Sequence, residues 1–173
     1  MRPCGVRSVA RYGTPLSCLL YPRATGRKRF EMNEKAKETE ALVRRYYDCF
    51  NRGDIDGMLA CVTDDIIHDV NQGERRIGKE RFHAFCARMA HHYKERLEDI
   101  TVMTTPDGSR AAAEFNVHGT YLETDPGLPP ANGQTYILPA GTFFAVRDGK
   151  IARITTYYNL TDWIVQVSGN SKE

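Results

Sequence analysis

The apolar residues of this chain change their spacing near residue 97, and this change restricts the folds that the chain can adopt. Before it, apolar residues recur with the period of one helix face, and the clearest set is Leu42, Val43, Tyr46, Tyr47 and Phe50. After it, they alternate with polar residues, which is the period of a half-buried strand. Helices followed by a run of strands indicate an α+β domain, with three N-terminal helices packed on one face of a curved, mostly antiparallel sheet.

Three helices are predicted from their start and stop signals. Asn33 is a candidate N-cap of the first helix and Gly53 its stop, while Asp54 can cap a short second helix. A third helix begins near Gly78 and is expected to bury Phe82, Phe85, Cys86, Met89 and Tyr93. The segment IIHDVNQG (66–73) lies between the second and third helices and is predicted to be a short strand that ends in a turn.

Two hairpins are predicted after the third helix. The strands LEDITVMTT and SRAAAEFNVHGTYL are joined at TPDGS, and QTYILPAGTFFAV and KIARITTYYNL are joined at RDGK. The segment ETDPGLPPANG between the hairpins contains three prolines and two glycines, so it is expected to be a loop. Its position suits a lid over a pocket, or a cover for a sheet edge.

Charge separates residues 1–31 from the remainder. They hold seven basic residues and one acid, whereas the rest holds 17 basic and 21 acidic residues, which argues against nucleic-acid binding. We expect residues 1–31 to be a disordered basic extension, residues 32–167 to be the domain and residues 168–173 to be a tail. The arginine-rich extension also resembles an organelle transit peptide, so a mitochondrial location is the alternative to a cytoplasmic one.

Several classes of protein lack their signals in this sequence. No run approaches the roughly eighteen apolar residues of a transmembrane helix, so no membrane insertion is expected. Five cysteines without a CxxC pair fit a reducing compartment. Neither a glycine-rich phosphate loop nor a GxSxG elbow occurs, and the histidines lack metal-ligand spacing. We therefore expect neither a cofactor nor a metal.

Three segments resemble the NTF2-like superfamily: ALVRRYYDCFNRGDIDGMLACVTDD (41–65), RIGKERFHAF (76–85) and VRDGKIARITTYY (146–158). The phrase HDVNQG, with the later strands, is similar to the SnoaL-like, ketosteroid-isomerase-related proteins of that superfamily. The resemblance implies a cone formed by a strongly curved sheet, with an apolar pocket for a small apolar molecule. It also implies cofactor-free acid/base chemistry and a homodimer formed through the sheet.

The resemblance assigns catalytic roles to Tyr46 and to one residue of the first strand. Tyr46 matches a phenol that donates a hydrogen bond to a substrate oxyanion, although it could equally be a core tyrosine. His68 and Asp69 point to opposite faces of a regular strand, so only one of them can enter the pocket and move a proton. His68 does so if the inward parity of the family holds, and Asp69 does so if a bulge shifts the register.

The second acid of the isomerase oxyanion hole would fall near Gly141 or Thr142, and neither can replace a carboxylic acid, which argues against steroid isomerase chemistry itself. The predicted ligand-binding residues are Asn71, Glu114, Asn116, His118, Tyr157 and Trp163. Three of them (Glu114, Asn116, His118) share one strand face, which lines the pocket or else faces solvent or a dimer partner.

The sequence therefore predicts a cofactor-independent enzyme that transfers protons on a small, apolar, oxygen-bearing substrate. The reaction would be of the isomerase, cyclase, dehydratase or epoxide hydrolase kind. The alternative is a non-catalytic ligand-binding or dimerisation module, because one fold can serve either purpose.

Overall fold

The computed structural model describes residues 33–71 and 73–169. The predicted basic extension (1–31) and the last four residues of the predicted tail lie outside the described residues. None of the described helices is both long enough and apolar enough to cross a lipid bilayer.

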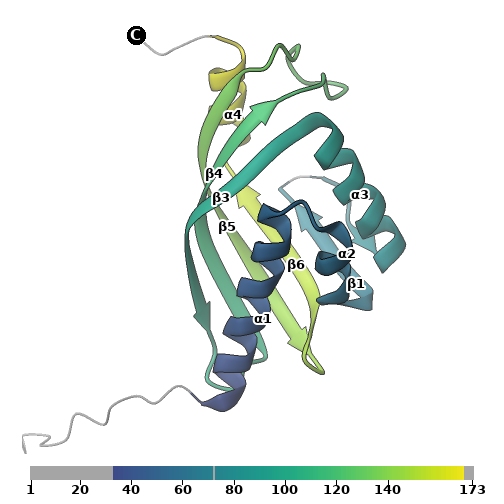
Figure 1. Ribbon diagram of the computed structural model, residues 1–173, viewed down its shortest axis with the longest axis vertical. Helices are drawn as coiled ribbons and strands as arrows, with labels where there is room; N and C mark the ends of the chain where they lie inside the picture. The colour runs from purple at the N-terminus through teal and green to yellow at the C-terminus, as the bar shows by residue number, and fades with distance from the viewer. Residues whose placement is uncertain (1–32, 72, 170–173) are drawn as a thin grey trace, which may run out of the picture. The chain divides into compact units, whose positions relative to one another are not determined.

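A curved six-stranded sheet in the order β2-β1-β6-β5-β4-β3 frames the domain (Figure 1). Its strands are β1 (Val62–Val70), β2 (Arg76–Ile77), β3 (Tyr93–Thr104), β4 (Arg110–Tyr121), β5 (Thr135–Arg147) and β6 (Lys150–Tyr158). Neighbouring strands run antiparallel, except that β1 runs parallel to β6. The predicted α+β class is confirmed.

The three predicted N-terminal helices are α1 (Glu34–Asn51), α2 (Ile55–Ala60) and α3 (Lys79–His92). Their predicted caps are confirmed: Asn33 Oδ1 accepts from the Lys35 amide at 3.3 Å, and Asp54 Oδ1 accepts from the Gly57 amide at 2.7 Å. A fourth helix, α4 (Leu160–Val167), was not predicted. It begins after Asn159, whose side chain accepts from the Asp162 amide at 3.1 Å.

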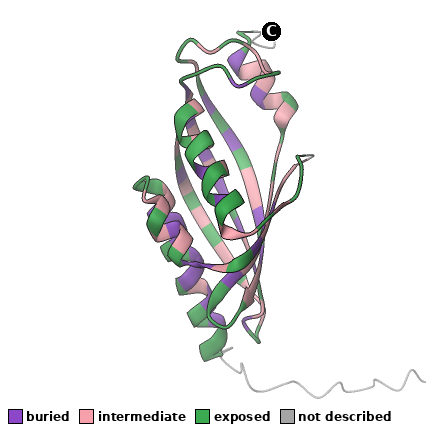
Figure 2. Cartoon of the chain, turned by 90° about the vertical axis from the view of Figure 1, so that its right-hand side faces the viewer, coloured by how far each residue is buried: buried purple, intermediate pink, exposed green. Residues whose placement is uncertain are grey.

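The core lies between α1 and the inner face of the sheet. Tyr47 of α1 makes edge-to-face contacts with Phe115 of β4 and Phe144 of β5, with ring centroids 5.2 and 5.9 Å apart. Buried and exposed residues alternate along the long strands, as Figure 2 shows. One face of the sheet therefore packs against the helices, and the other, called the outer face below, does not.

The boundary between α3 and β3 differs from the prediction. Tyr93 was expected on the buried side of the third helix, but its backbone is extended (φ −136°, ψ 140°) and it pairs with Tyr121 of β4. The two phenol rings stack with centroids 5.2 Å apart. This cross-strand stacking outweighs the continuing helical spacing of apolar residues, so β3 begins at Tyr93 instead of Leu97.

The two predicted hairpins are confirmed. In the second one, Asp148 (φ 51°) and Gly149 (φ 70°) both adopt positive φ, as the tight two-residue turn requires. In the first, Asp99 of β3 has φ 55° and the pairing of β3 with β4 shifts between Glu98 and Thr101. This bulge changes which β3 residues face inward.

Candidate functional site

A cavity of about 850 Å³ lies on the inner side of the sheet. Most of its wall is aromatic or aliphatic, and the side chains come from all four helices and every long strand. Cavities of roughly 300–1,000 Å³ with apolar walls and a few polar groups are typical of small-molecule sites. The polar groups in this wall therefore define what chemistry the cavity can support.

His68 lies in this wall and is only 3% exposed. Its ring packs against Phe82 and Phe85, with centroids 5.0 and 4.6 Å away. Its Nδ1 atom is buried and has no hydrogen-bond partner among the described residues. Burial, with a smaller effect of the Arg76 charge, lowers the pKa of His68 to about 4. The imidazole is therefore neutral at physiological pH.

Asp69 points to the outer face. Its carboxylate accepts two hydrogen bonds from the Arg75 guanidinium, both at 2.9 Å, and this contact lowers its pKa. The irregularity between β1 and β6 lies upstream, between Val62 and Ile67, and leaves His68 facing inward. Of the two alternatives for the first strand, the structure thus places His68 in the cavity and Asp69 outside it.

Tyr46 also lies in the cavity wall and is buried. Burial is the main cause that raises its pKa well above the usual value, and the neighbouring Cys86, Tyr47 and Cys61 raise it further. A phenol in this environment keeps its proton and can only act as a hydrogen-bond donor or acceptor. Tyr46 and His68 are therefore brought to the same cavity from different elements.

Asn71 and Trp163 are the other two predicted site residues that lie in the cavity wall. Asn71 adopts φ 44°, and its Oδ1 accepts from the Tyr158 amide at 3.0 Å, while its buried Nδ2 has no hydrogen-bond partner among the described residues. Trp163 reaches the wall from α4 and makes an edge-to-face contact with Tyr136, with ring centroids 5.9 Å apart.

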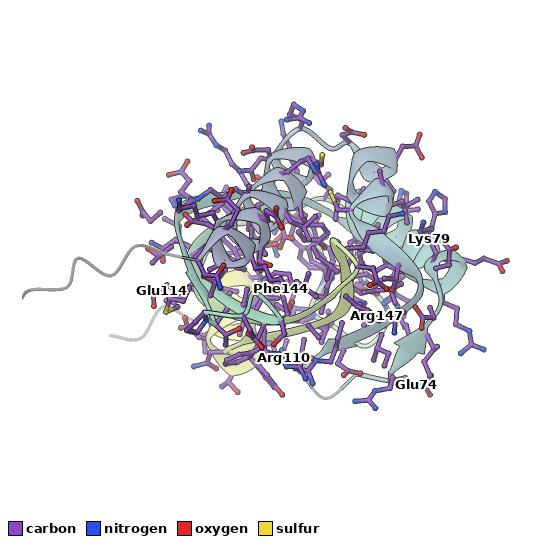
Figure 3. All side chains as sticks on the ribbon, turned by 90° about the horizontal axis from the view of Figure 1, so that it is seen from below. Glu74, Lys79, Arg110, Glu114, Phe144 and Arg147 are labelled. Carbon is purple, nitrogen blue, oxygen red and sulfur yellow. The ribbon has the colours of Figure 1, made fainter. Side chains whose placement is uncertain are left out.

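The other predicted ligand-binding residues lie on the outer face. Phe115 and Val117 of β4 take the inward positions, so Glu114, Asn116 and His118 point outward. Figure 3 shows Glu114 at the periphery and Phe144 in the interior. The outward residues contact other polar groups, since Asn116 Nδ2 donates to Asp99 Oδ2 at 3.0 Å and His118 Nε2 lies 3.5 Å from a Glu98 oxygen.

Tyr157 of β6 is also on the outer face and is 51% exposed. Its ring packs edge to face on that of Phe143, with centroids 6.1 Å apart. The sheet curls so that the polar row of β4 and Tyr157 are both turned away from the cavity. This row was predicted either to line the pocket or to face solvent or a dimer partner. The structure supports the second alternative.

The polar residues in the cavity wall that were not predicted from the sequence include Glu95 and Tyr136. Glu95 of β3 faces inward, and its Oε1 accepts a hydrogen bond from the Tyr136 hydroxyl at 2.5 Å. Burial raises the pKa of Glu95, and the Tyr136 hydrogen bond opposes this rise. The signal that could have found it is the alternation Tyr93, Glu95, Leu97, which was hidden because these residues follow a helical pattern.

The loop between β4 and β5 closes one end of the cavity. It was predicted from its prolines, and its Asp125 and Leu128 lie in the wall. The carboxylate of Asp125 forms an ion pair with Arg88 of α3 and accepts from the Tyr93 hydroxyl at 3.1 Å. Among the described residues, no group of three histidine, cysteine or acidic side chains is placed to hold a metal ion.

A curled sheet that holds a cavity beneath its helices is the architecture of NTF2-like proteins. An NTF2-like protein from Burkholderia pseudomallei shares the fold, with a TM-score of 0.65 and 18% identity over 76% of this chain and 98% of that chain. The chain matches the SnoaL-like domain over residues 43–154 and therefore belongs to that family. The predicted resemblance to SnoaL-like proteins is confirmed.

Two solved structures are much more similar in sequence, and both proteins are proposed polyketide cyclases. The one from Pseudomonas putida is 62% identical, covers 75% of this chain and 97% of its own, and has a TM-score of 0.73. The one from Xanthomonas campestris is 53% identical, covers 77% and 98%, and has a TM-score of 0.75. No curated protein matches the chain.

Proposed function

We propose that this domain is a cofactor-independent enzyme that transfers protons on a small, largely apolar, oxygen-bearing molecule bound in the cavity. The observation that carries the proposal is the neutral His68 imidazole in the wall of the cavity. It shares an apolar cavity with the Tyr46 phenol. A base and a hydrogen-bond donor are the two groups that enolisation of a carbonyl compound requires.

In the proposed reaction, His68 removes a proton from a carbon next to a carbonyl group. The electron pair of that C–H bond moves to the carbonyl oxygen and forms an enolate, to which Tyr46 donates a hydrogen bond. With a pKa of about 4, His68 is a weak base before a substrate binds. The negative charge of a bound enolate would raise that pKa and so favour the proton transfer.

The next step distinguishes the members of this reaction class. Return of the proton to another carbon gives an isomerase, and attack of the enolate on a second carbonyl of the same molecule gives a cyclase. Loss of a hydroxyl group as water, with the proton from His68, gives a dehydratase. The relatives proposed to be polyketide cyclases favour the cyclase reaction, since they share 53% and 62% identity with this chain.

The test is a turnover screen of linear 1,3-diketones, carbonyl steroids and small epoxides, with substitutions in the first strand. We expect His68→Ala to lower kcat/KM by about 10²–10⁴-fold, the usual contribution of a general base. Asp69→Asn is the matched control, because the neighbouring side chain lies outside the cavity, and it should keep the activity. Equal losses in both variants would refute the assigned role of His68.

A non-catalytic ligand-binding module is the second candidate function. It is favoured by the low basicity of His68, whose pKa of about 4 suits a hydrogen-bonding group as well as a base. In that case compounds from the screen would bind to the wild-type protein without being converted. Isothermal titration calorimetry beside the turnover assay separates the two functions.

We also propose that the outer face of the sheet forms a homodimer with a second copy of the chain. Four large apolar side chains on this face are about half exposed: Met103, Ile137, Phe143 and Tyr157. An apolar patch of this kind on a sheet marks an interaction surface. Analytical ultracentrifugation should show a dimer for the wild type and a monomer for Phe143→Lys. Ile77→Lys, at the far edge strand, is the control that should remain dimeric.

A further inference from the structure

Three neighbouring strands build a carboxyl–phenol pair inside the cavity. Glu95 of β3 is opposite Gly119 of β4, and Gly119 is opposite Tyr136 of β5. The Tyr136 hydroxyl crosses the intervening strand and donates to Glu95 Oε1 at 2.5 Å. This distance is at the short end of the range for O–H···O hydrogen bonds in proteins.

Gly119 makes this crossing possible. A Cβ atom at this position would lie 2.1 Å from Cζ of Tyr136 and 2.4 Å from its hydroxyl oxygen. No side chain can therefore stand between Glu95 and Tyr136 while the phenol keeps its position. Gly119 is not among the seven described glycines that adopt positive φ, so its backbone conformation does not itself require glycine. The absence of a side chain at Gly119 therefore allows the hydrogen bond between Tyr136 and Glu95.

The Glu95 carboxyl has room for a further partner. Tyr136 binds Oε1, and Oε2 accepts no hydrogen bond from the described residues. No described cation forms an ion pair with Glu95, whereas the second acid in this region, Asp125, is paired with Arg88. Glu95 lines the cavity, so the free oxygen is accessible to a bound molecule.

This pair is remote from His68. His68 is in register with Ile154 of β6, which pairs with Phe144 near the end of β5. Tyr136 lies at the start of the same strand. The side chains around Glu95 also differ, since Trp163 of α4 packs on Tyr136 and the β4–β5 loop closes this end.

We infer that the Glu95–Tyr136 pair is a second ligand-binding position in the cavity, which takes a hydroxyl group of the bound molecule. The inference depends on the proposed function only because both place the bound molecule in the same cavity. A hydroxyl group can donate to, or accept from, the free carboxyl oxygen, whichever protonation state Glu95 has. A carboxylate in this place would meet Glu95 and Asp125 and would be disfavoured.

Burial supports this choice of ligand. It raises the pKa of Glu95 and, with the charge of Glu95, that of Tyr136. Both groups therefore hold their protons more firmly than in water, and the position suits a neutral polar group. The substrate would carry a hydroxyl group at the end remote from the carbon that His68 deprotonates.

The test uses three probes of one shape: 4-cyclohexylphenol, its methyl ether and 4-cyclohexylbenzoate. Trp163 is the only tryptophan of the chain and lines this end of the cavity, so quenching of its fluorescence reports occupancy. Calorimetry supplies the dissociation constants. We expect the wild type to bind the phenol about tenfold more tightly than the ether, the value of one hydrogen bond. The benzoate should bind more weakly than the phenol.

Substitutions locate the hydroxyl group. Glu95→Leu should abolish the preference for the phenol over the ether, and Glu95→Gln, which keeps donor and acceptor atoms, should retain it. Glu98→Leu is the matched control, because this residue lies on the outer face of the same strand. If Glu95→Leu does not fold by circular dichroism, Glu95→Ala provides the same measurement.

The inference would be overturned by equal binding of phenol and ether by the wild type, by a preference that survives Glu95→Leu, or by tighter binding of the benzoate. Absence of binding by all probes would overturn it too. The readout is binding, so the inference can hold even where the turnover screen finds no reaction. Conversely, turnover that depends on His68 can coexist with the loss of this second position.

Discussion

Acidification is expected to destabilise the domain through His68. Burial, with the charge of Arg76, lowers the pKa of His68 from 6.5 to about 4. Between these two pH values the unfolded chain binds a proton at this residue and the folded chain does not. Stability rises with pH wherever the unfolded state holds more protons. The stability contributed by neutral His68 is therefore present above pH 6.5 and is lost as the pH falls towards 4.

The size of this effect follows from the two pKa values. A pKa difference from 6.5 to about 4 corresponds to about 3 kcal/mol when the pH has fallen below both values, at about 1.4 kcal/mol per pH unit. Most of this free energy is already lost at pH 4.5, so the expected change between pH 7 and pH 4.5 is about 2 kcal/mol. His68 is 3% exposed, so solvent screening reduces it little.

Urea unfolding of the wild type and of His68→Gln at both pH values measures this contribution. The variant lacks the titrating group, while the carboxylates titrate in both proteins. The wild type should therefore lose about 2 kcal/mol more than the variant on acidification. His83→Gln removes an exposed imidazole of α3 and is the matched control, which should behave as the wild type does. Equal acid-induced losses in wild type and His68→Gln would show that burial does not lower the pKa of His68, and would contradict its place in an apolar wall.

Three further predictions concern the contacts around the cavity. Gly119→Ala should destabilise the wild type by about 2 kcal/mol, because the new Cβ overlaps the Tyr136 ring, and should become neutral or stabilising in a Tyr136→Ala background, as urea unfolding of all four proteins would show. Arg75→Met should leave the urea midpoint of unfolding almost unchanged, because its guanidinium is exposed to solvent where it pairs with Asp69. Arg88→Met should cost about 1–2 kcal/mol in the same assay, because it leaves the Asp125 carboxylate without its cation.

Local signals in the sequence predicted most of the fold. Asn33 and Asp54 cap helices through bonds to amides two and three residues away, and Asp148-Gly149 makes a turn through its own backbone angles. Each of these interactions is complete within a few residues, so a single sequence is enough to find it. The fourth helix was missed because α4 is short and follows directly on an apolar strand.

The candidate site depends on information that is not local. The alternation of side chains in β1 separates His68 from Asp69, but the direction of curvature of the sheet decides which of them enters the cavity. The same curvature turns Glu114, Asn116 and His118 outward. Glu95 was missed for another reason, since the helix-to-strand boundary at Tyr93 depends on stacking with a residue far along the chain, Tyr121.

The unpaired polar atoms of the domain give a final reason to regard the cavity as a binding site. Among the described residues, five buried side-chain atoms have no hydrogen-bond partner, and three of them, Tyr47 Oη, His68 Nδ1 and Asn71 Nδ2, belong to residues of the cavity wall. Each such atom costs about 1–3 kcal/mol of stability, and an apolar side chain would remove that cost. A ligand with oxygen atoms would recover part of it where binding shifts the neighbouring side chains and uncovers these atoms. The wall is thus less stable than an apolar wall of the same shape, and that difference favours an oxygen-bearing ligand over a hydrocarbon of the same shape.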